Sequence, residues 1–203
     1  MKVIKFISAL TFFRFTCFIF WLVTCPALVG QASQKRLLTP KDYEYWNIMS
    51  PDKISSDGNW VSYRLHYEYS KKDTLVFQNS SAGQKHFHPD AKEGKFNAEM
   101  HFACISKDTL FLHDLKTGKM DKTPRVKAFD FSANHKFISI IFKSSDQKSD
   151  LEIRNTAGKV VYQLSGLTTY CFDPEKKGIV YEISQNDVSS VEMLLFKDDL
   201  QKK

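Results

Sequence analysis

The segment Ile54–Tyr63, ISSDGNWVSY, decides the fold because its pattern returns along the chain. An apolar residue leads into a polar turn, and a strand of apolar and β-branched residues follows. The same order occurs in FSANHKFISI (131–140) and FDPEKKGIVY (172–181), whose starts lie first 77 and then 41 residues apart. Because 77 is close to twice 41, one unit is missing from this set. The turns contain residue types that tolerate positive φ in tight hairpins, namely Asp57-Gly58, Asn134-His135 and Lys177-Gly178.

A second pattern, a strand followed by a turn, supports the repeat. It occurs in LVFQNSSAG (75–83), LFLHDLKTG (110–118) and LEIRNTAG (151–158), and MLLFKDDLQ (193–201) is interpreted as a fourth copy. The starts are 35, 41 and 42 residues apart. Gly118 and Gly158, with Asp57, Gly58 and Gly178 of the first pattern, are therefore predicted to be structural residues of the blade turns. The unit missing from the first set falls at residues 96–105.

A period near 40 residues built from short strands is typical of a β-propeller blade, which takes about 40–45 residues for four strands. The predicted fold is therefore all-β, a partial or small β-propeller of about four blades with a short N-terminal helix. A β-sandwich also gives many short strands, but it does not require a recurring 41-residue offset. The blades are expected over residues 51–203. The last strand stops just after its turn, so the chain is expected to be truncated.

Residues 1–32 have the composition of an export signal. Lys2 and Lys5 precede an apolar stretch at 15–23, which is too short to span a bilayer, and small residues lead to a predicted cleavage after Ala32. We therefore expect a periplasmic or secreted protein without a stable membrane span once the signal is removed. Lipidation at Cys25 is the alternative. Export also permits a disulfide between the remaining Cys104 and Cys171, although two half-buried thiols are the simpler expectation.

Residues 33–50 form a predicted lead-in segment with a short helix. Thr39 is placed as N-cap and Pro40 as the first helical residue. Tyr43 and Trp46 are three residues apart and would face one side, where we expect core packing in preference to an exposed docking site. The net charge of +6 includes no long basic block, so nucleic-acid binding is not expected.

Few residues suggest chemistry. His86 and His88 alternate along a predicted strand with Asp90 nearby, which makes them weak candidates for a metal site; a solvated loop is the alternative. Asp57, Asp130 and Asp173 recur beside the blade-opening strands, where they could form a ring of carboxylates or, as the pattern favours, cap turns. No nucleotide-binding glycine loop occurs, and no cofactor is expected.

Two ordered stretches, LTPKDYEYWNIMSPDKISSDGNWVSYRL (38–65) and DTLFLHDLKTGKMDKTPRVKAFDF (108–131), resemble the N-terminal region of exported prolyl-oligopeptidase-family serine peptidases from Bacteroidetes-type bacteria. The resemblance covers about residues 38–183. It implies a propeller that restricts peptide access to an α/β-hydrolase domain carrying a Ser-Asp-His triad.

The sequence departs from that family in its chemistry. A nucleophile elbow needs Gly-x-Ser-x-Gly, and none of the eight glycines lies four residues from another across a serine. No catalytic residue is therefore assigned, and the chain alone is expected to be inactive. The expected function is the non-catalytic propeller portion of such a peptidase, whose partners are peptide substrate and a hydrolase domain. A stand-alone periplasmic binding or scaffold propeller, or an inactive remnant, remains the alternative.

Overall fold

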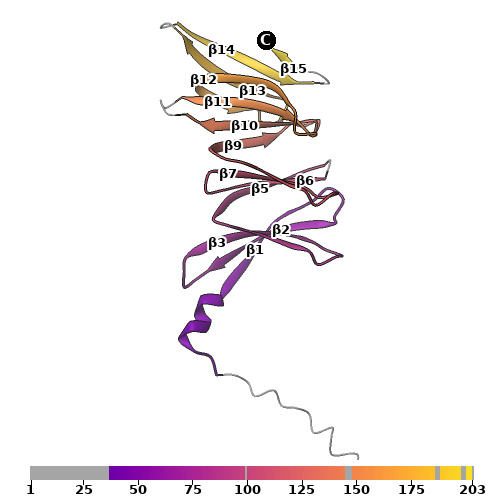
Figure 1. Cartoon of the computed structure of the whole chain (residues 1–203), viewed down its shortest axis with the longest axis vertical. Coiled ribbons are helices and arrows are strands. Elements are labelled where there is room, and N and C mark those ends of the chain that lie inside the picture. Colours follow the sequence, from indigo (N-terminus) through magenta and orange to yellow (C-terminus); the bar gives the residue numbers. More distant parts are fainter. Residues whose placement is uncertain (1–36, 99, 145–147, 186–187, 198–199, 203) are drawn as a thin grey trace, which may run out of the picture. The chain divides into compact units, whose positions relative to one another are not determined.

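The computed structural model describes residues 37–203 except 99, 145–147, 186–187, 198–199 and 203. Residues 41–203 form one compact unit, which contains all the described strands (Figure 1). The elements are η2 (Pro40–Tyr45), a 3-10 helix, and the strands β1 (Asn47–Ile54), β2 (Trp60–Tyr67), β3 (Lys72–Asn79), β4 (Lys85–Pro89), β5 (Ala91–Asn97), β6 (His101–Ser106), β7 (Thr109–Asp114), β8 (Met120–Thr123), β9 (Val126–Phe131), β10 (Phe137–Lys143), β11 (Ser149–Asn155), β12 (Val160–Phe172), β13 (Gly178–Gln185), β14 (Val188–Phe196) and β15 (Leu200–Lys202).

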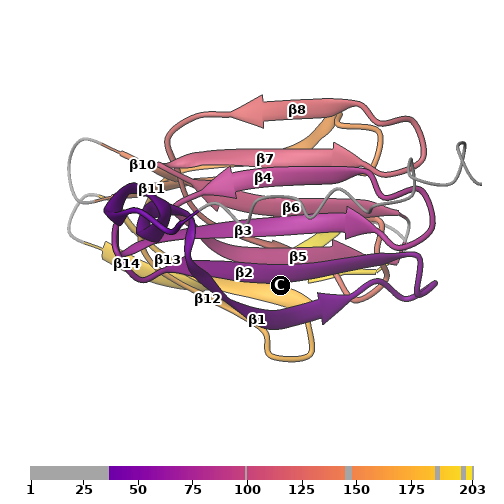
Figure 2. The same cartoon turned by 90° about the horizontal axis from the view of Figure 1, so that it is seen from below.

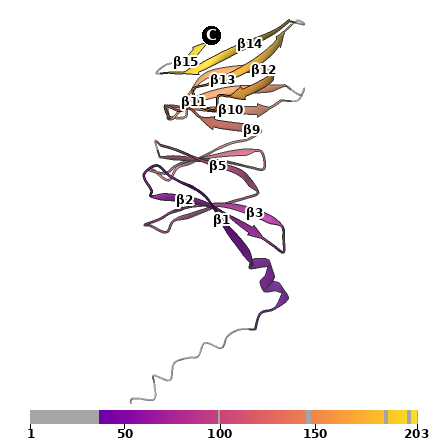
Figure 3. The same cartoon turned by 180° about the vertical axis from the view of Figure 1, so that it is seen from behind.

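The strands pair in chain order and always antiparallel. One sheet runs β1-β2-β3-β4, the next runs β5-β6-β7-β8, and a seven-stranded sheet contains β9 to β15. The sheets follow one another in chain order (Figure 1, Figure 3), and the strands of the first sheet lie side by side in Figure 2. Hairpin connection of every neighbouring pair is the pattern of a β-meander, which is what a propeller blade requires.

The seven-stranded sheet is two blades that share β12. Its first part pairs with β11 as far as Leu167, opposite Ser149, and the residues from Leu167 onward pair with β13. Gly166, with a φ of 84°, lies at the change of partner, where the register is irregular. We therefore define blade 1 as β1–β4, blade 2 as β5–β8, blade 3 as β9–β11 with the first part of β12, and blade 4 as the rest of β12 with β13–β15.

The predicted fold class is confirmed, since the described chain is almost entirely strand, has four four-stranded blades and begins with a short helix. Two details differ. Blade 1 begins at Asn47, before the expected boundary at residue 51. The helix η2 contains no buried residue, and Tyr43 and Trp46 pack on each other edge to face with centroids 4.6 Å apart. The expected core packing of these two rings is therefore wrong, because each ring remains more than 40% exposed.

The repeated turn has the same hydrogen bonds in blades 1 and 3. The buried Ser55 hydroxyl accepts the Trp60 amide hydrogen at 2.9 Å, and the Ser132 hydroxyl accepts that of Phe137 at 3.0 Å. Each serine also donates to the residue two places on, Asp57 or Asn134. The turn thus satisfies a buried backbone donor that would otherwise be costly.

Strand register corrects the sequence alignment of the fourth blade. In each blade, the fifth residue of the second strand pairs with a residue of the third strand that we call the leading position. The leading positions are occupied by Leu75 opposite Arg64, Leu110 opposite Ile105, Leu151 opposite Ile141 and Val191 opposite Glu182. The sequence pattern aligns Met193 with Leu151, but the strand pairing makes Val191 the equivalent of Leu151. The register between the second and third strands of blade 4 therefore differs by two residues from the register that the sequence pattern predicts.

Apolar clusters fill the spaces between consecutive blades. Trp60, Leu75 and Phe77 of blade 1 pack with Phe102 and Cys104 of blade 2. A second cluster joins blades 2 and 3 through Ala103, Leu110, Phe129, Ile138 and Ile140, and a third joins blades 3 and 4 through Leu151, Ile153, Ile179, Tyr181 and Leu194. The two faces of blades 2 and 3 are thus both covered, which holds successive blades together by burial of apolar area.

Residues 1–36, which include the expected signal, Ala32 and Cys25, lie outside the described residues. Within the part of the chain that the structure describes, no helix is both long and apolar enough to cross a membrane.

Candidate functional site

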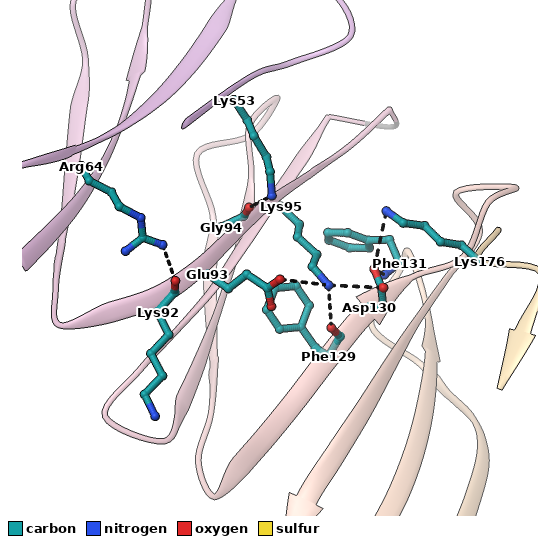
Figure 4. A network of polar contacts seen from close by, with 10 residues as sticks. All are labelled: Lys53, Arg64, Lys92, Glu93, Gly94, Lys95, Phe129, Asp130, Phe131 and Lys176. Atoms are coloured by element: carbon teal, nitrogen blue, oxygen red, sulfur yellow. Dashed lines mark hydrogen bonds and ion pairs between the residues drawn. The ribbon is translucent and has the colours of Figure 1, made fainter. Parts of the chain in front are cut away.

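The first strands of blades 1, 2 and 3 are joined by a polar network (Figure 4). The Lys53 ammonium of β1 donates to the Gly94 carbonyl of β5 at 2.8 Å. From β2, the Arg64 guanidinium donates to the carbonyls of Ala91, at 2.8 Å, and Lys92. These contacts are charge-assisted hydrogen bonds from blade 1 side chains to backbone carbonyls of β5, so they fix β5 against blade 1.

Lys95 is the centre of the network. Its Nζ lies 3.3 Å from Asp130 Oδ2 and 3.6 Å from Glu93 Oε1, and it donates to the Phe129 carbonyl at 3.2 Å. The side chains of Lys95 and Asp130 are each only 16% exposed. A partly buried, hydrogen-bonded pair is stronger than a surface salt bridge because water screens it less.

Asp130 also receives a cation from blade 4. Lys176 Nζ, in the turn between β12 and β13, lies 3.6 Å from Asp130 Oδ1. The carboxylate of blade 3 therefore links residues of blades 2 and 4. The two other aspartates act locally, because Asp57 accepts the Asn59 amide hydrogen at 3.1 Å and Asp173 that of Lys177 at 2.9 Å. Turn capping is the role of Asp57 and Asp173, and a ring of three carboxylates does not form.

The network contains charged groups of both signs. They are the side chains of Lys53, Arg64, Lys95, Lys176, Glu93 and Asp130. Glu93 and Lys176 remain about half exposed, so their charges are accessible from solvent. Groups of this kind can attract a ligand that carries charges of either sign.

The structure places His86 and His88 on β4 and adds a third ring, His113 of β7. His88 Nε2 and His113 Nε2 lie 3.0 Å apart, and both rings are buried between blades 1 and 2. One ring must donate its Nε2 hydrogen to the other, so at least one of the two is neutral. Phe77 stacks on His86 with centroids 4.5 Å apart and 9° between planes.

Burial shifts the titration of this cluster. Desolvation, with smaller contributions from His86 and Lys122, lowers the pKa of His88 to about 4. Desolvation and the neighbouring His88 and His86 lower the pKa of His113 to about 3. Desolvation also lowers the pKa of His86. All three rings are therefore neutral at pH 7.

A cavity of about 240 Å³ lies beside these rings. It is lined by Trp60, Phe77, His86 and His113 and by the turn of residues 114–118. The cavity connects the β7–β8 turn with the interface between blades 1 and 2. Aromatic rings line one side of it, and the polar side chains of Gln84, Asp114, Lys116 and Thr117 line the rest, so the cavity is small and mostly polar.

Asp90, which the sequence placed near the two histidines, makes other contacts. Its carboxylate lies 3.6 Å from Lys107 Nζ, and its amide hydrogen goes to the Asp73 carbonyl. In the described residues, no group of three or more His, Cys, Asp or Glu side chains has the geometry to hold a metal ion.

The turn glycines differ in what they do. Gly58, Gly118 and Gly158 lie in hairpin turns with φ values of 72°, 74° and 81°. Gly178 instead begins β13, and the residue with positive φ in that turn is Lys176, at 58°. Gly178 is needed for space, because a Cβ there would lie 2.6 Å from the Leu194 carbonyl oxygen.

Cys104 and Cys171 are both free thiols, one buried and the other exposed. Burial in the cluster between blades 1 and 2 raises the pKa of Cys104 to about 12. Cys104 therefore stays protonated and acts as a small apolar side chain.

Sequence reasoning did not identify Lys95 or His113 as members of a cluster. Lys95 lies in the blade whose turn pattern had degenerated, so no repeat position marked it. His113 is the fourth residue of LFLHDLKTG, which was interpreted only as a strand and turn. Its signal is the β-strand alternation, since Phe111 and His113 share the face of β7 that is turned toward blade 1.

No protein-family model and no curated protein matches the chain. Solved structures do match. The β-propeller domain of the Trilobed protease from Pyrococcus furiosus, described as having an open velcro topology, aligns with a TM-score of 0.50 and 14% identity over 78% of this chain and 57% of that chain. The acylaminoacyl peptidase of Pyrococcus horikoshii aligns with a TM-score of 0.49 and 15% identity, over 80% of this chain and 33% of that chain.

A structure from a study of two prolyl endopeptidases aligns with a TM-score of 0.48 and 11% identity, over 79% of this chain and 30% of that chain. The chain thus spans little more than half of the Pyrococcus furiosus propeller domain and about a third of the other two proteins. At these identities the likeness concerns the fold. The likeness to the Pyrococcus furiosus β-propeller domain agrees with the strand order described above, and the fold of this chain is a β-propeller.

Proposed function

We propose that the chain is the non-catalytic propeller portion of an exported prolyl-oligopeptidase-like serine peptidase. In this role it restricts peptide access to an α/β-hydrolase domain and docks on that domain. The fold match to the propeller domain of a protease carries the proposal. The ordered motifs that resemble this peptidase family support it, because they fall on β1–β2 and on β7–β9 of consecutive blades.

The polar network of the first strands is the surface that we assign to gating. Blades of a propeller surround a central channel, and the first strand of each blade borders it. Lys53, Lys95 and Lys176 with Glu93 and Asp130 give this surface both signs of charge. A peptide entering along it would meet fixed charges that favour one orientation of its termini. Export is part of the proposal and rests on the signal-like residues 1–32.

The genomic sequence beyond the codon for Lys203 gives the first test. An open reading frame for an α/β-hydrolase with Gly-x-Ser-x-Gly, followed by Asp and His, is expected there. Its absence from that neighbourhood would overturn the docking role.

The second test is kinetic. We expect the hydrolase, co-purified with the chain, to cleave a proline-containing octapeptide but to discriminate against a 40-residue peptide of the same scissile sequence. The hydrolase without the chain should lose that discrimination. The chain alone should cleave neither. Equal discrimination with and without the chain would contradict gating.

A stand-alone binding propeller is the second candidate, and the cavity beside Trp60, His86 and His113 favours it. Binding of proline-containing peptides to the chain alone, abolished by Trp60→Leu and unchanged by Lys176→Met, would support this candidate. The reverse pattern would support the channel surface.

A further inference from the structure

Each blade has a leading face, turned toward the following blade, and a trailing face, turned toward the preceding one. The leading positions defined above belong to the first of these faces. The trailing face uses the second and fourth residues of the second strand. These residues are Val61 and Tyr63 in blade 1, Phe102 and Cys104 in blade 2, Ile138 and Ile140 in blade 3, and Ile179 and Tyr181 in blade 4.

The leading position is buried wherever a following blade covers it. Leu75 is 0% exposed, Leu110 1% and Leu151 0%. Val191, at the same position in blade 4, is 72% exposed, and its neighbour on that face, Met193, is 39% exposed. No described strand covers this face. Apolar side chains are thus exposed in blade 4 at positions that a following blade covers in blades 1 to 3.

The trailing face shows the reverse pattern. Its positions are buried in blades 2, 3 and 4. In blade 1, Val61 and Tyr63 are only half-buried, and with Met49 and Pro51 they line an apolar hollow of about 440 Å³. Within the described residues, the trailing face of blade 1 is therefore uncovered, and so is the leading face of blade 4. Elsewhere in the chain, a leading face of this kind packs on a trailing face of this kind. These are the two halves of an interface that the chain already builds three times.

We propose that a second copy of this chain completes both faces, with blade 4 of each copy packed on blade 1 of the other. The inference does not depend on the peptidase proposal, since it rests on the internal repeat. The occupant is a blade because the same positions in blades 1, 2 and 3 are covered by a blade. The second copy fits because each chain carries both complementary faces.

Two copies are the number at which the contacts can close. A head-to-tail interface either closes into a ring or continues as a filament. Two copies of the four described blades give a ring of eight blades, which is within the range of about four to eight found in propellers. Within residues 37–203, this closure covers the open faces of blades 1 and 4 in both copies.

Analytical ultracentrifugation of the purified chain, from about 1 to 100 µM, tests the proposal. We expect the mass of two chains at the upper end of the range. Val191→Asp should weaken the dimer by about 100-fold or more, because it would bury an unpaired carboxylate in the interface. Tyr63→Asp should do the same from the other face. Val188→Asp is the matched control, because Val188 is 69% exposed but alternates with Val191 onto the opposite face of β14.

Mixing the two damaged variants tests the head-to-tail geometry. Val191→Asp retains an intact blade 1 face and Tyr63→Asp an intact blade 4 face, so the mixture should form heterodimers through one intact interface while each variant alone stays monomeric. A misfolded variant would not be rescued in this way. A monomeric wild-type chain at 100 µM would overturn the proposal. So would open-ended polymers, or a dimer unaffected by Val191→Asp and Tyr63→Asp.

Discussion

His88 Nε2 lies 3.0 Å from His113 Nε2 in the interface between blades 1 and 2, with both rings buried. The two residues come from different blades and are 25 positions apart in the chain. The packing of blade 1 on blade 2 therefore depends on the protonation state of the His88–His113 pair. Placing a proton on both rings would bring two positive charges together in an apolar cluster.

Acid should destabilise the fold through this pair. The pKa values of His88 and His113 in the folded chain, about 4 and about 3, lie below the value of about 6.5 in the unfolded chain. Between these values the unfolded chain binds more protons, so stability is complete above pH 6.5 and falls as the pH drops toward 4. From pH 7 to pH 5 we expect a loss of at most about 2 kcal/mol per ring. Urea unfolding across this range measures it.

His113→Phe should flatten the slope of stability against pH, because it removes one of the two buried rings. An unchanged slope in His113→Phe would mean that other groups cause the acid sensitivity.

Phe77 supports the same interface through packing. Its side chain is fully buried, and its ring lies 4.3 Å from that of Phe102, centroid to centroid. Phe77→Ala should lower the free energy of unfolding by about 3–5 kcal/mol, because it removes buried area and leaves a cavity. Thermal and urea denaturation provide the measurement. Tyr69→Ala, at an exposed ring in the β2–β3 turn, should change it by less than about 0.5 kcal/mol. Similar effects of the two substitutions would contradict the assignment of the core.

The repeat could be predicted from sequence because its turns have strict chemistry. The motif at Ile54–Tyr63 combines a serine, a short polar side chain and a residue that accepts positive φ. All three lie within one turn, so the sequence of that turn alone is enough to predict it. The number of blades followed from the period alone. The sequence could not fix the register of the fourth blade, since MLLF contains apolar residues at both parities and either Val191 or Met193 fits the pattern. Pairing with β13 decides between them.

The candidate site was harder to predict than the fold. Lys95 and Asp130 are 35 residues apart and meet because their strands begin consecutive blades. Nothing local distinguishes Lys95 from the other lysines of the chain. Strand alternation indicates His86 and His88, but their partner His113 comes from another blade. Contacts across blades depend on packing, and a single sequence carries no direct signal of it.

The turn serines should contribute equally, since their hydrogen bonds are equivalent. Ser132→Ala leaves the buried Phe137 amide hydrogen without its acceptor at 3.0 Å, and Ser55→Ala does the same to Trp60. Each change should lower stability by about 1–2 kcal/mol. Ser144→Ala, at an exposed position outside the strands, serves as a control expected within about 0.5 kcal/mol of wild type. Unequal losses for Ser55 and Ser132 in chemical denaturation would contradict the equivalence of the turns.

A Cβ added at Gly178 would clash with backbone, whereas a Cβ added at Gly94 would clash with side chains. A Cβ on Gly178 would lie 2.6 Å from the Leu194 carbonyl oxygen, whereas one on Gly94 would meet the side chains of Phe102 and Leu75 at 2.8 and 2.9 Å. Side chains can move, but the paired backbone of β14 cannot without losing ladder hydrogen bonds. Gly178→Ala should therefore cost about 2–3 kcal/mol and Gly94→Ala about 1 kcal/mol. Denaturation midpoints at constant m-value would test this, and the reverse order would refute it.

The Lys95–Asp130 pair should show a measurable coupling energy. Asp130→Asn removes the carboxylate that lies 3.3 Å from Lys95 and 3.6 Å from Lys176, and Lys95→Met removes the cation at the centre of the network. We expect a coupling of about 1 kcal/mol in a double-mutant cycle, larger than that of an exposed pair. Glu93→Gln, at a carboxylate that is 56% exposed, is the matched control and should couple to Lys95 by less than about 0.5 kcal/mol. Coupling of Lys95 to Glu93 as strong as its coupling to Asp130 would mean that burial does not strengthen the pair, and the network would then be a solvated surface arrangement.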